Sequence, residues 1–406
     1  MPATQTAAKV GAWFAISLAL VTILGPAGTD MYLASLPDIV ADLKGTESMG
    51  QLTLTVYLLA MGVGQLVFGP LTDAFGRRKP LLAALVAFLA ASLWAAGSPS
   101  LEVLLGARAL QGLAAALTLV VALSMVRDAA QGVRAAQLFA LLMTIEGLVP
   151  VLAPTAGGFI DQHFGWRMVF LALAGLTAIA TVNTTFTMPE TLPKSSRIQL
   201  RPREILRTYA RIAKDPAFLL PTLGLSLVFF FLFGYIGGAP FVYQGEFGLD
   251  AGQFGLLFGC TGLAVMLGAI VTGRMVSRWG AAKLAFIGTA LVLGGAVLAF
   301  ALHAAGLGLG GIVAGMFLSL FGLGVAESTL MALAMGSQDV SLGSTAALLG
   351  ALQLTISSAA TPLSGLAVEA GVPAWLGFLM AGAAAALVIV GISAKRAPVL
   401  TDLESH

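Results

Sequence analysis

The chain has 406 residues, of which 58% are hydrophobic and only 10% are charged, for a formal net charge of +2. Soluble domains carry about 25% charged residues, so this composition excludes a soluble protein and indicates that lipid surrounds most of the chain. The small net charge gives no electrostatic basis for binding nucleic acid. The single cysteine, Cys260, excludes an internal disulfide and indicates no metal cluster, and we expect no cofactor.

Apolar segments long enough to cross a bilayer recur along the whole chain. A helix needs about 20 residues to span the hydrocarbon core. Six such segments precede a polar stretch and six follow it, so we predict an all-α membrane protein with twelve transmembrane helices. The predicted spans are 11–35, 48–70, 80–98, 102–125, 136–160 and 166–188, then 217–242, 251–272, 283–303, 308–334, 342–368 and 373–394.

The polar stretch 189–216 divides the chain into two similar parts. We predict an N-terminal six-helix bundle over 1–188, a cytoplasmic linker over 189–216, and a C-terminal bundle with a short tail over 217–406. The linker is basic, and we expect a short amphipathic helix on the inner membrane surface around 203–213. Two bundles joined in this way suggest parallel repeats around a central site.

The basic residues predict the orientation. If both termini are cytoplasmic, the only lysine or arginine residues in the outer loops are Lys44 and Arg167, and Arg108 is the only one within a span, out of 21 in total. This asymmetry follows the positive-inside rule, so we expect both termini in the cytoplasm.

Two charged residues lie inside predicted spans at matching depth. Asp30 and Arg108 are each about six residues from the outer end of their span, or roughly 9–10 Å below the outer surface. We predict that they interact directly or through water. Pairing would favour the ionised Asp30, and its disruption would let Asp30 take a proton. The alternative is a hydrated carboxylate at a helix end and an arginine that clamps backbone carbonyls.

Two glutamates are further candidates because they lie deep in predicted spans. Glu146 is near mid-membrane on the same helix face as Pro150 and Pro154, and could titrate or bind a cationic substrate. Alternatively, it is paired with a hydroxyl or backbone group. Glu327 lies in the inner half of its span and could line the inner vestibule. The predicted substrate cavity comprises Tyr32, Tyr57, Gln111, Glu146, Phe233, Tyr235, Glu327 and Gln353, although most aromatic residues of these spans can equally pack or face lipid.

The segment after the second span reads Gly-Pro-Leu-Thr-Asp-Ala-Phe-Gly-Arg-Arg-Lys over 69–79. It resembles the loop G-x-L-x-D-x-x-G-R-[RK] of the major facilitator superfamily, in which this motif latches the two halves in one state of alternating access. Glycines permit a tight turn, the acid can pair with a cation or cap a helix, and the basic residues bind the inner interface. The residues concerned are Gly69, Asp73, Gly76, Arg77 and Arg78. A simple topology anchor is the alternative.

Two more motifs fit the same family. Residues 108–112 read Arg-Ala-Leu-Gln-Gly, which resembles the R-x-x-Q-G motif of proton-coupled members. Pro150, Pro154, Gly157 and Gly158 resemble the motif G-x-x-x-G-P-x-x-G-G of the exporter branch, with alanine at position 153 where glycine is usual. Such a helix is kinked and can pack closely against the other half. The alternative is an ordinary kinked packing helix.

The sequence at 29–37, Thr-Asp-Met-Tyr-Leu-Ala-Ser-Leu-Pro, is similar to a signature of the bicyclomycin and chloramphenicol resistance (Bcr/CflA) group, and further similarities extend to residue 353. The resemblance implies a monomeric, proton-coupled exporter of small, mostly lipophilic drugs such as amphenicols, in a bacterial inner membrane. A related exporter type carries another acid where this chain has Thr22, so Asp30 and Glu146 would supply the proton chemistry.

The sequence leaves three other classes of function to compare with drug export. An exporter of a specific metabolite, such as an amino acid or a siderophore, and a membrane sensor without transport stay open as alternatives. An enzyme is disfavoured, because the three histidines have no catalytic spacing and no nucleotide-binding loop is present. Transport would then draw on an ion gradient. Protons suit the available acids better than sodium, which also stays open.

Overall fold

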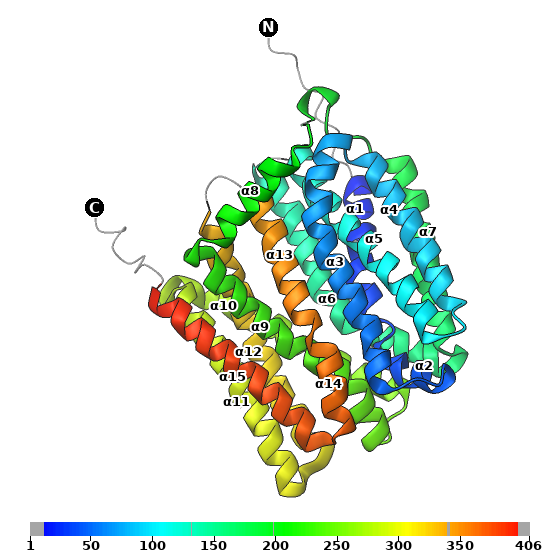
Figure 1. Ribbon diagram of the computed structural model, residues 1–406, viewed down its shortest axis with the longest axis vertical. Helices are drawn as coiled ribbons and strands as arrows, with labels where there is room; N and C mark the ends of the chain where they lie inside the picture. The colour runs from blue at the N-terminus through cyan, green and yellow to red at the C-terminus, as the bar shows by residue number, and fades with distance from the viewer. Residues whose placement is uncertain (1–11, 131, 198, 339–341, 397–406) are drawn as a thin grey trace.

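The computed structural model describes residues 12–130, 132–197, 199–338 and 342–396. It is helical along nearly all of this length, with eleven long helices and a twelfth that is broken in two (Figure 1). The long helices are α1 (Ala12–Asp30), α3 (Glu47–Phe75), α4 (Arg78–Ala96), α5 (Leu101–Ala129), α6 (Gly132–Phe164), α7 (Trp166–Thr187), α9 (Pro216–Pro240), α10 (Ala251–Trp279), α11 (Ala281–Leu302), α12 (Gly308–Gly336), the pair α13 (Leu342–Ser358) and α14 (Ala360–Glu369), and α15 (Val372–Arg396).

Short helical elements join or extend these helices. They are η1 (Leu33–Ser35), α2 (Leu36–Asp42), η2 (Lys194–Ser196), α8 (Pro202–Ala213), η3 (Phe241–Glu246) and η4 (His303–Leu307). Ten stretches of the described residues are long and apolar enough to cross a membrane, and one of them, Ala281–Gly336, comprises both α11 and α12. The predicted all-α membrane fold is confirmed.

The helices pack in two groups, called here the N half (α1–α7) and the C half (α9–α15). Within the N half, α3 packs on α5, α4 on α7 and α1 on α6. Within the C half, α12 packs on α10 and α11, and α15 packs on α9 and α11. Two sets of helices join the halves. Helix α6 packs along α10, and α3 lies along α13 and α14 (Figure 1). The end of the bundle that holds Arg77 is assigned to the cytoplasm by the charge distribution and is called the inner end.

The two halves contain matching helix corners. Both α3 and α10 are 29 residues long, and each ends in a glycine with positive φ, which is 92° at Gly76 and 73° at Gly280. In each case the glycine amide donates a hydrogen bond back into the helix, to Thr72 or to Val276. A residue with a side chain is strained in this conformation, so glycine ends the helix and turns the chain toward the next one.

The structure corrects one element of the sequence prediction. The segment 69–79 was expected to be a loop, but residues 69–75 belong to α3 and only Gly76 and Arg77 separate α3 from α4. Apolarity ends near Pro70, yet the backbone hydrogen bonds of a helix continue where the side chains become polar. The segment is therefore a helix–helix corner.

The predicted span 342–368 is also interrupted. It is divided at Ala359 into α13 and α14, and the residues around the break face α3. Thr361 in α14 and Thr55 in α3 are joined by a short hydrogen bond across the two halves.

Both seams between the halves are closely packed toward the outer end. On the α3 seam, a Cβ at Gly62 would lie 3.2 Å from Leu354, whereas at Gly69, two turns further on the same face, none of the described residues comes within 4 Å. On the α6 seam, a Cβ at Gly158 would overlap the carbonyl oxygen of Ala251. A Cβ at Gly147 would have no neighbour within 4 Å among the described residues. Contacts between the halves also continue nearer the inner end, where a Cβ at Gly350 in α13 would overlap Oε1 of Gln65 in α3, and one at Gly343 would lie 3.6 Å from Nη1 of Arg127.

Candidate functional site

Arg108, on α5, has a completely buried side chain inside the N half. Its guanidinium carbon lies 4.2 Å from the ring centroid of Tyr32 and 4.2 Å from that of Tyr57, so the cation is held between two aromatic rings. Each cation–π contact is worth about 2 kcal/mol when the groups are desolvated. Both tyrosines are themselves fully buried. The rings therefore offset part of the cost of removing the cation from water.

Hydrogen bonds fix the orientation of the guanidinium. Its Nη1 donates to the carbonyl oxygen of Gly28, at 2.8 Å, and to Oε1 of Gln111, at 2.6 Å. Gln111 is held in turn, because its Nε2 donates to the hydroxyl of Ser92 at 2.8 Å. The hydroxyl of Tyr57 donates to the carbonyl oxygen of Gly25 at 2.8 Å. Carbonyls of α1 thus receive bonds from both α5 and α3.

The same guanidinium retains unused donors. Nε and Nη2 of Arg108 are buried and have no hydrogen-bond partner among the described residues. An unsatisfied buried donor costs about 1–3 kcal/mol, and more when it is charged. Such a cost is expected where a group must be available to bind a ligand or to change partners.

Asp30 ends α1 beside this arginine and is only 6% exposed. Asp30 and Arg108 both act electrostatically on the hydroxyls of Tyr32 and Tyr57, so these residues and Gln111 form one buried group, called here the Arg108 cluster. Asp30 and Arg108 form no direct ion pair among the described residues. The guanidinium is bound to the Gly28 carbonyl, as in the alternative given for this arginine, and is also held by the two rings.

The other predicted cavity residues lie apart from the Arg108 cluster. Phe233 and Tyr235 are buried in the C half, and Tyr235 stacks on Phe258 with ring centroids 5.4 Å apart and an interplanar angle of 8°. Glu327 and Gln353 are half-buried, on α12 and α13. The side chain of Glu146 lies outside the described residues, although its backbone belongs to α6.

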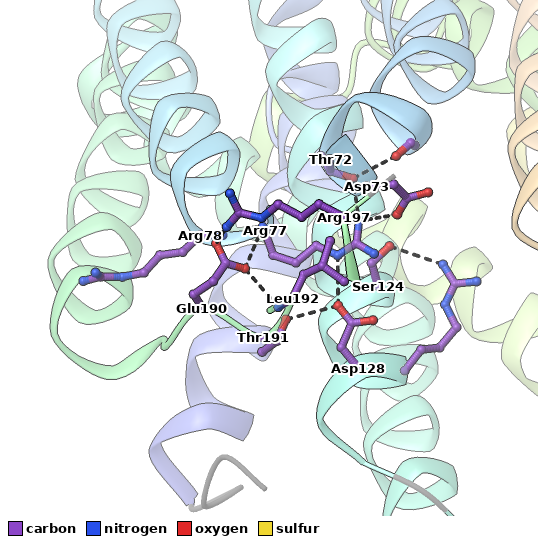
Figure 2. Close-up of polar contacts among 12 residues, drawn as sticks. Thr72, Asp73, Arg77, Arg78, Ser124, Asp128, Glu190, Thr191, Leu192 and Arg197 are labelled. Carbon is purple, nitrogen blue, oxygen red and sulfur yellow. Dashed lines mark hydrogen bonds and ion pairs between the residues drawn. The ribbon is translucent and has the colours of Figure 1, made fainter. Parts of the chain in front are cut away.

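The inner corner of the N half holds a network of ion pairs (Figure 2). Arg77 is 5% exposed and pairs with Asp73 at 2.6 Å and with Asp128, at the end of α5, at 2.9 Å. Burial alone would lower the pKa of Arg77. The hydrogen bonds and charges of Asp128 and Asp73 outweigh it and raise this pKa above its ordinary value, so the guanidinium stays charged.

Glu190, just after α7, completes the corner. One carboxylate oxygen accepts from the backbone N–H of Arg77 at 2.9 Å, and the other accepts from that of Arg78 at 3.4 Å. The carboxylate thus caps the start of α4, a role that sequence reasoning gave to Asp73. Arg197 pairs with Glu190 at 3.5 Å, and the hydroxyl of Thr191 donates to Asp128 (Figure 2). A separation of more than 100 residues hid this cap from any local pattern.

The linker helix α8 touches both halves at the same end. The hydroxyl of Tyr209 donates to the backbone carbonyl of Leu66 in α3 at 3.0 Å, and α8 also packs on α9 and α13. Burial, and then the charge of Asp73, raise the pKa of Tyr209 above its ordinary value, so this hydroxyl keeps its proton and can donate. The linker is therefore bound to the helix that carries Asp73.

The proline-containing helix α6 makes backbone contact with the C half. Successive turns approach α10 at three points: Gly158 meets the carbonyl of Ala251, Pro154 meets Gly255, and Val151 meets Gly259. On another face, Gly157 meets the carbonyl of Met31, at the end of α1. Pro150 and Pro154 both lie within the helix. This arrangement brings the helix backbones closer than side chains would allow.

The described residues contain no group of three His, Cys, Asp or Glu side chains that could hold a metal ion. The Arg108 cluster offers guanidinium, carboxyl, amide and phenol groups.

Comparisons with known proteins agree with this architecture. Residues 18–362 match the family model of the Major Facilitator Superfamily. The MFS-type transporter YdgK of Bacillus subtilis, described as uncharacterized, is 33% identical over 388 residues, which cover 94% of this chain and 96% of that protein. A chloramphenicol resistance protein of Pseudomonas aeruginosa is 34% identical over 279 residues, which cover 68% of this chain and 65% of that protein.

A solved structure shares the fold. A bacterial homologue of the human lysosomal transporter Spinster, crystallised in an inward-facing, unoccupied conformation, superposes with a TM-score of 0.71 at 15% identity, covering 94% of this chain and 95% of that one. The family match covers most of the chain, so this multi-pass membrane protein is a transporter, not an enzyme, and belongs to the major facilitator superfamily.

Proposed function

We propose that this transporter is a proton-coupled exporter of small, mostly lipophilic molecules in a bacterial cytoplasmic membrane. The observation that carries the proposal is the fully buried Arg108, with two unused donors, in one cluster with the buried acid Asp30. Intramembrane charges are expensive and mark ion or substrate pathways. The chloramphenicol resistance protein among the relatives supports the choice of cargo.

The proposed mechanism uses the free donors of Arg108 as an exchange site. The carboxylate of Asp30, once it has lost its proton, can accept from Nε or Nη2, because both nitrogens are unoccupied. When Asp30 binds a proton, that attraction weakens and the donors become available again. Gln111 and the two tyrosine rings keep the guanidinium in place while its partner changes. Proton binding and partner exchange would thus alternate on one rigid scaffold.

Movement of the halves would connect this exchange to export. The predicted bundles 1–188 and 217–406, joined by the linker 189–216, would rock about the seams that α6 and α3 make with the C half. The cavity between them would receive the substrate through Phe233, Tyr235, Glu327 and Gln353, together with Glu146. The ion pairs around Arg77, with Gly69, Gly76 and Arg78, would hold the inner corner rigid during this movement.

Proton release upon substrate binding tests the proposal. Purified protein in detergent is mixed with chloramphenicol or a lipophilic cation, and the pH of a weakly buffered solution is recorded. Wild type should release protons, and Asp30→Asn should lose that release while it still binds the compound. Glu102→Gln removes an exposed acid of α5 and is the matched control. Glu146→Gln tests the second candidate carrier.

The outcomes separate the possible functions. Proton release lost in Asp30→Asn but kept in Glu102→Gln supports the proposal. A compound that binds without proton release, under conditions where Asp30 is accessible, overturns proton antiport. Release only with an amino acid or a siderophore in the panel would replace drug export with export of that metabolite.

A further inference from the structure

A second buried acid lies outside the Arg108 cluster. Asp161, on α6, is 5% exposed and follows Gly157 by one helical turn, so both point in the same direction. Gly157 packs directly against the carbonyl of Met31. Asp161 therefore faces the chain that continues from Met31, which forms η1 and then α2.

Two polar side chains of that segment face Asp161. Ser35, the last residue of η1, is completely buried, and Asp38, in the first turn of α2, is exposed to the outer solution. Both approach the Asp161 carboxyl group closely enough to act on it as hydrogen-bonding groups, and Asp38 also acts through its charge. None of these approaches has the geometry of a formed hydrogen bond, so both carboxylate oxygens of Asp161 and the hydroxyl oxygen of Ser35 are left without one among the described residues.

Burial of the Asp161 carboxyl group is unfavourable when the group is ionised and has no partner. An ionised carboxylate without a partner costs several kcal/mol to bury, and a second carboxylate nearby increases the cost. The ion pairs of the described residues do not include Asp161, so no lysine or arginine offsets its charge. One positive charge from outside the protein would balance the one buried carboxylate. Carboxylate and hydroxyl oxygens are the ligands that small, hard cations prefer.

We propose that Asp161, Ser35 and Asp38 bind one small monovalent cation, a proton or Na⁺, taken from the outer solution. Asp161 and Ser35 supply the buried oxygens, and the exposed Asp38 marks the entrance. This site is separate from the Asp30 exchange proposed above, and the two can fail independently.

The site lies where its occupancy can affect closure of the outer seam. Besides contacting α6, η1 contacts α9 and α10 of the C half, and Nε2 of Gln244 donates to the carbonyl of Ala34 at 2.9 Å. A cation that neutralises Asp161 removes the cost of burying it against η1. Occupancy would therefore stabilise the closed outer seam seen in this structure.

Thermal unfolding of the purified full chain in detergent tests the site. Na⁺ is titrated at fixed pH with choline replacing it at constant ionic strength, and in a second series the pH is lowered without Na⁺. A ligand that binds only the folded state raises Tm with the logarithm of its concentration. Asp161→Asn is compared with Glu246→Gln, which removes an exposed acid at the same end of the molecule.

The two series distinguish the ligands. A rise in Tm with Na⁺ that Asp161→Asn abolishes and Glu246→Gln retains identifies Na⁺. A rise on acidification alone, with the same dependence on Asp161, identifies the proton. The proposal is overturned if wild type and Asp161→Asn respond equally in both series. The response should persist in Asp30→Asn, whatever becomes of the proton exchange there.

Ser35→Ala covers the case in which Asp161→Asn does not fold. This change keeps the charge of Asp161 and removes one oxygen ligand. The concentration of the bound cation, Na⁺ or proton, at the midpoint of the Tm titration should therefore rise at least tenfold. An unchanged midpoint in Ser35→Ala, together with an unchanged midpoint in Asp38→Asn, also overturns the site.

Discussion

Substitution of Gly158 by alanine should open the outer seam, because α6 has no room there for a side chain. A Cβ at this position would overlap the carbonyl oxygen of Ala251 in the C half, so one helix must move away from the other. Overpacking of this kind costs about 1–3 kcal/mol. Alanine also favours the helix by about 1 kcal/mol, but that gain is the same in every state of the transporter. The overpacking cost alone therefore sets the shift between states.

This cost corresponds to a shift of roughly 5- to 150-fold in the ratio of closed to open outer seams. Opening of the outer seam can be measured as the distance between two spin labels. The labels are attached to cysteines introduced by Lys44→Cys and Glu246→Cys, in the outer parts of the N half and the C half. The native Cys260 is exposed and is first replaced by serine. Gly158→Ala should lengthen the distances relative to the parent.

Gly175→Ala is the matched control, because a Cβ at this α7 position meets no described atom within 4 Å. Its distances should equal those of the parent. The reasoning fails if Gly158→Ala folds normally and leaves the distance distribution unchanged, because the backbone contact at Ala251 would then have no part in closing the seam.

Three further predictions concern polar contacts. Arg108→Lys replaces a planar cation that two rings enclose, and substrate-driven proton release should fall at least tenfold; wild-type release would contradict this role. Glu190→Gln weakens the cap of α4 and should cost about 1 kcal/mol, seen as a lower Tm, whereas Glu204→Gln, in an exposed pair, should change Tm little. Tyr209→Phe removes the bond to Leu66 and should cost about 1 kcal/mol by the same measurement; an unchanged Tm would show that α8 is held by apolar packing alone.

The sequence predicted the helices well because lipid imposes a simple rule on apolar length. It placed Arg108 inside a helix and Asp30 at the same depth, and both are buried. The sequence offers a carboxylate or backbone carbonyls as partners of Arg108 but cannot choose between them, because helix rotation and backbone geometry decide whether the guanidinium meets a carboxylate or the carbonyl of Gly28. The end of α3 was missed for a related reason: hydropathy falls at Pro70, but helical hydrogen bonding does not depend on apolar side chains.

Contacts between distant segments were the least accessible to sequence reasoning. Glu190 lies in the predicted linker 189–216, and only the folded chain places its carboxylate on the amides of Arg77 and Arg78. Asp161 lies just beyond the predicted span 136–160, so the sequence gives no reason to expect it to be buried. Its burial follows from Gly157, which draws the helix against the end of α1.

The α6–α10 seam has a mechanical consequence. Its three contacts, at Gly158, Gly255 and Gly259, are each between a glycine and a backbone carbonyl, one helical turn after another. At these three points backbone packs on backbone, and Thr155 adds a hydrogen bond from its hydroxyl to the carbonyl of Gly255 at 3.0 Å. Helices α6 and α10 can then separate one helical turn at a time, with a small and similar free-energy cost at each turn. The α6–α10 seam can therefore close tightly and still open quickly.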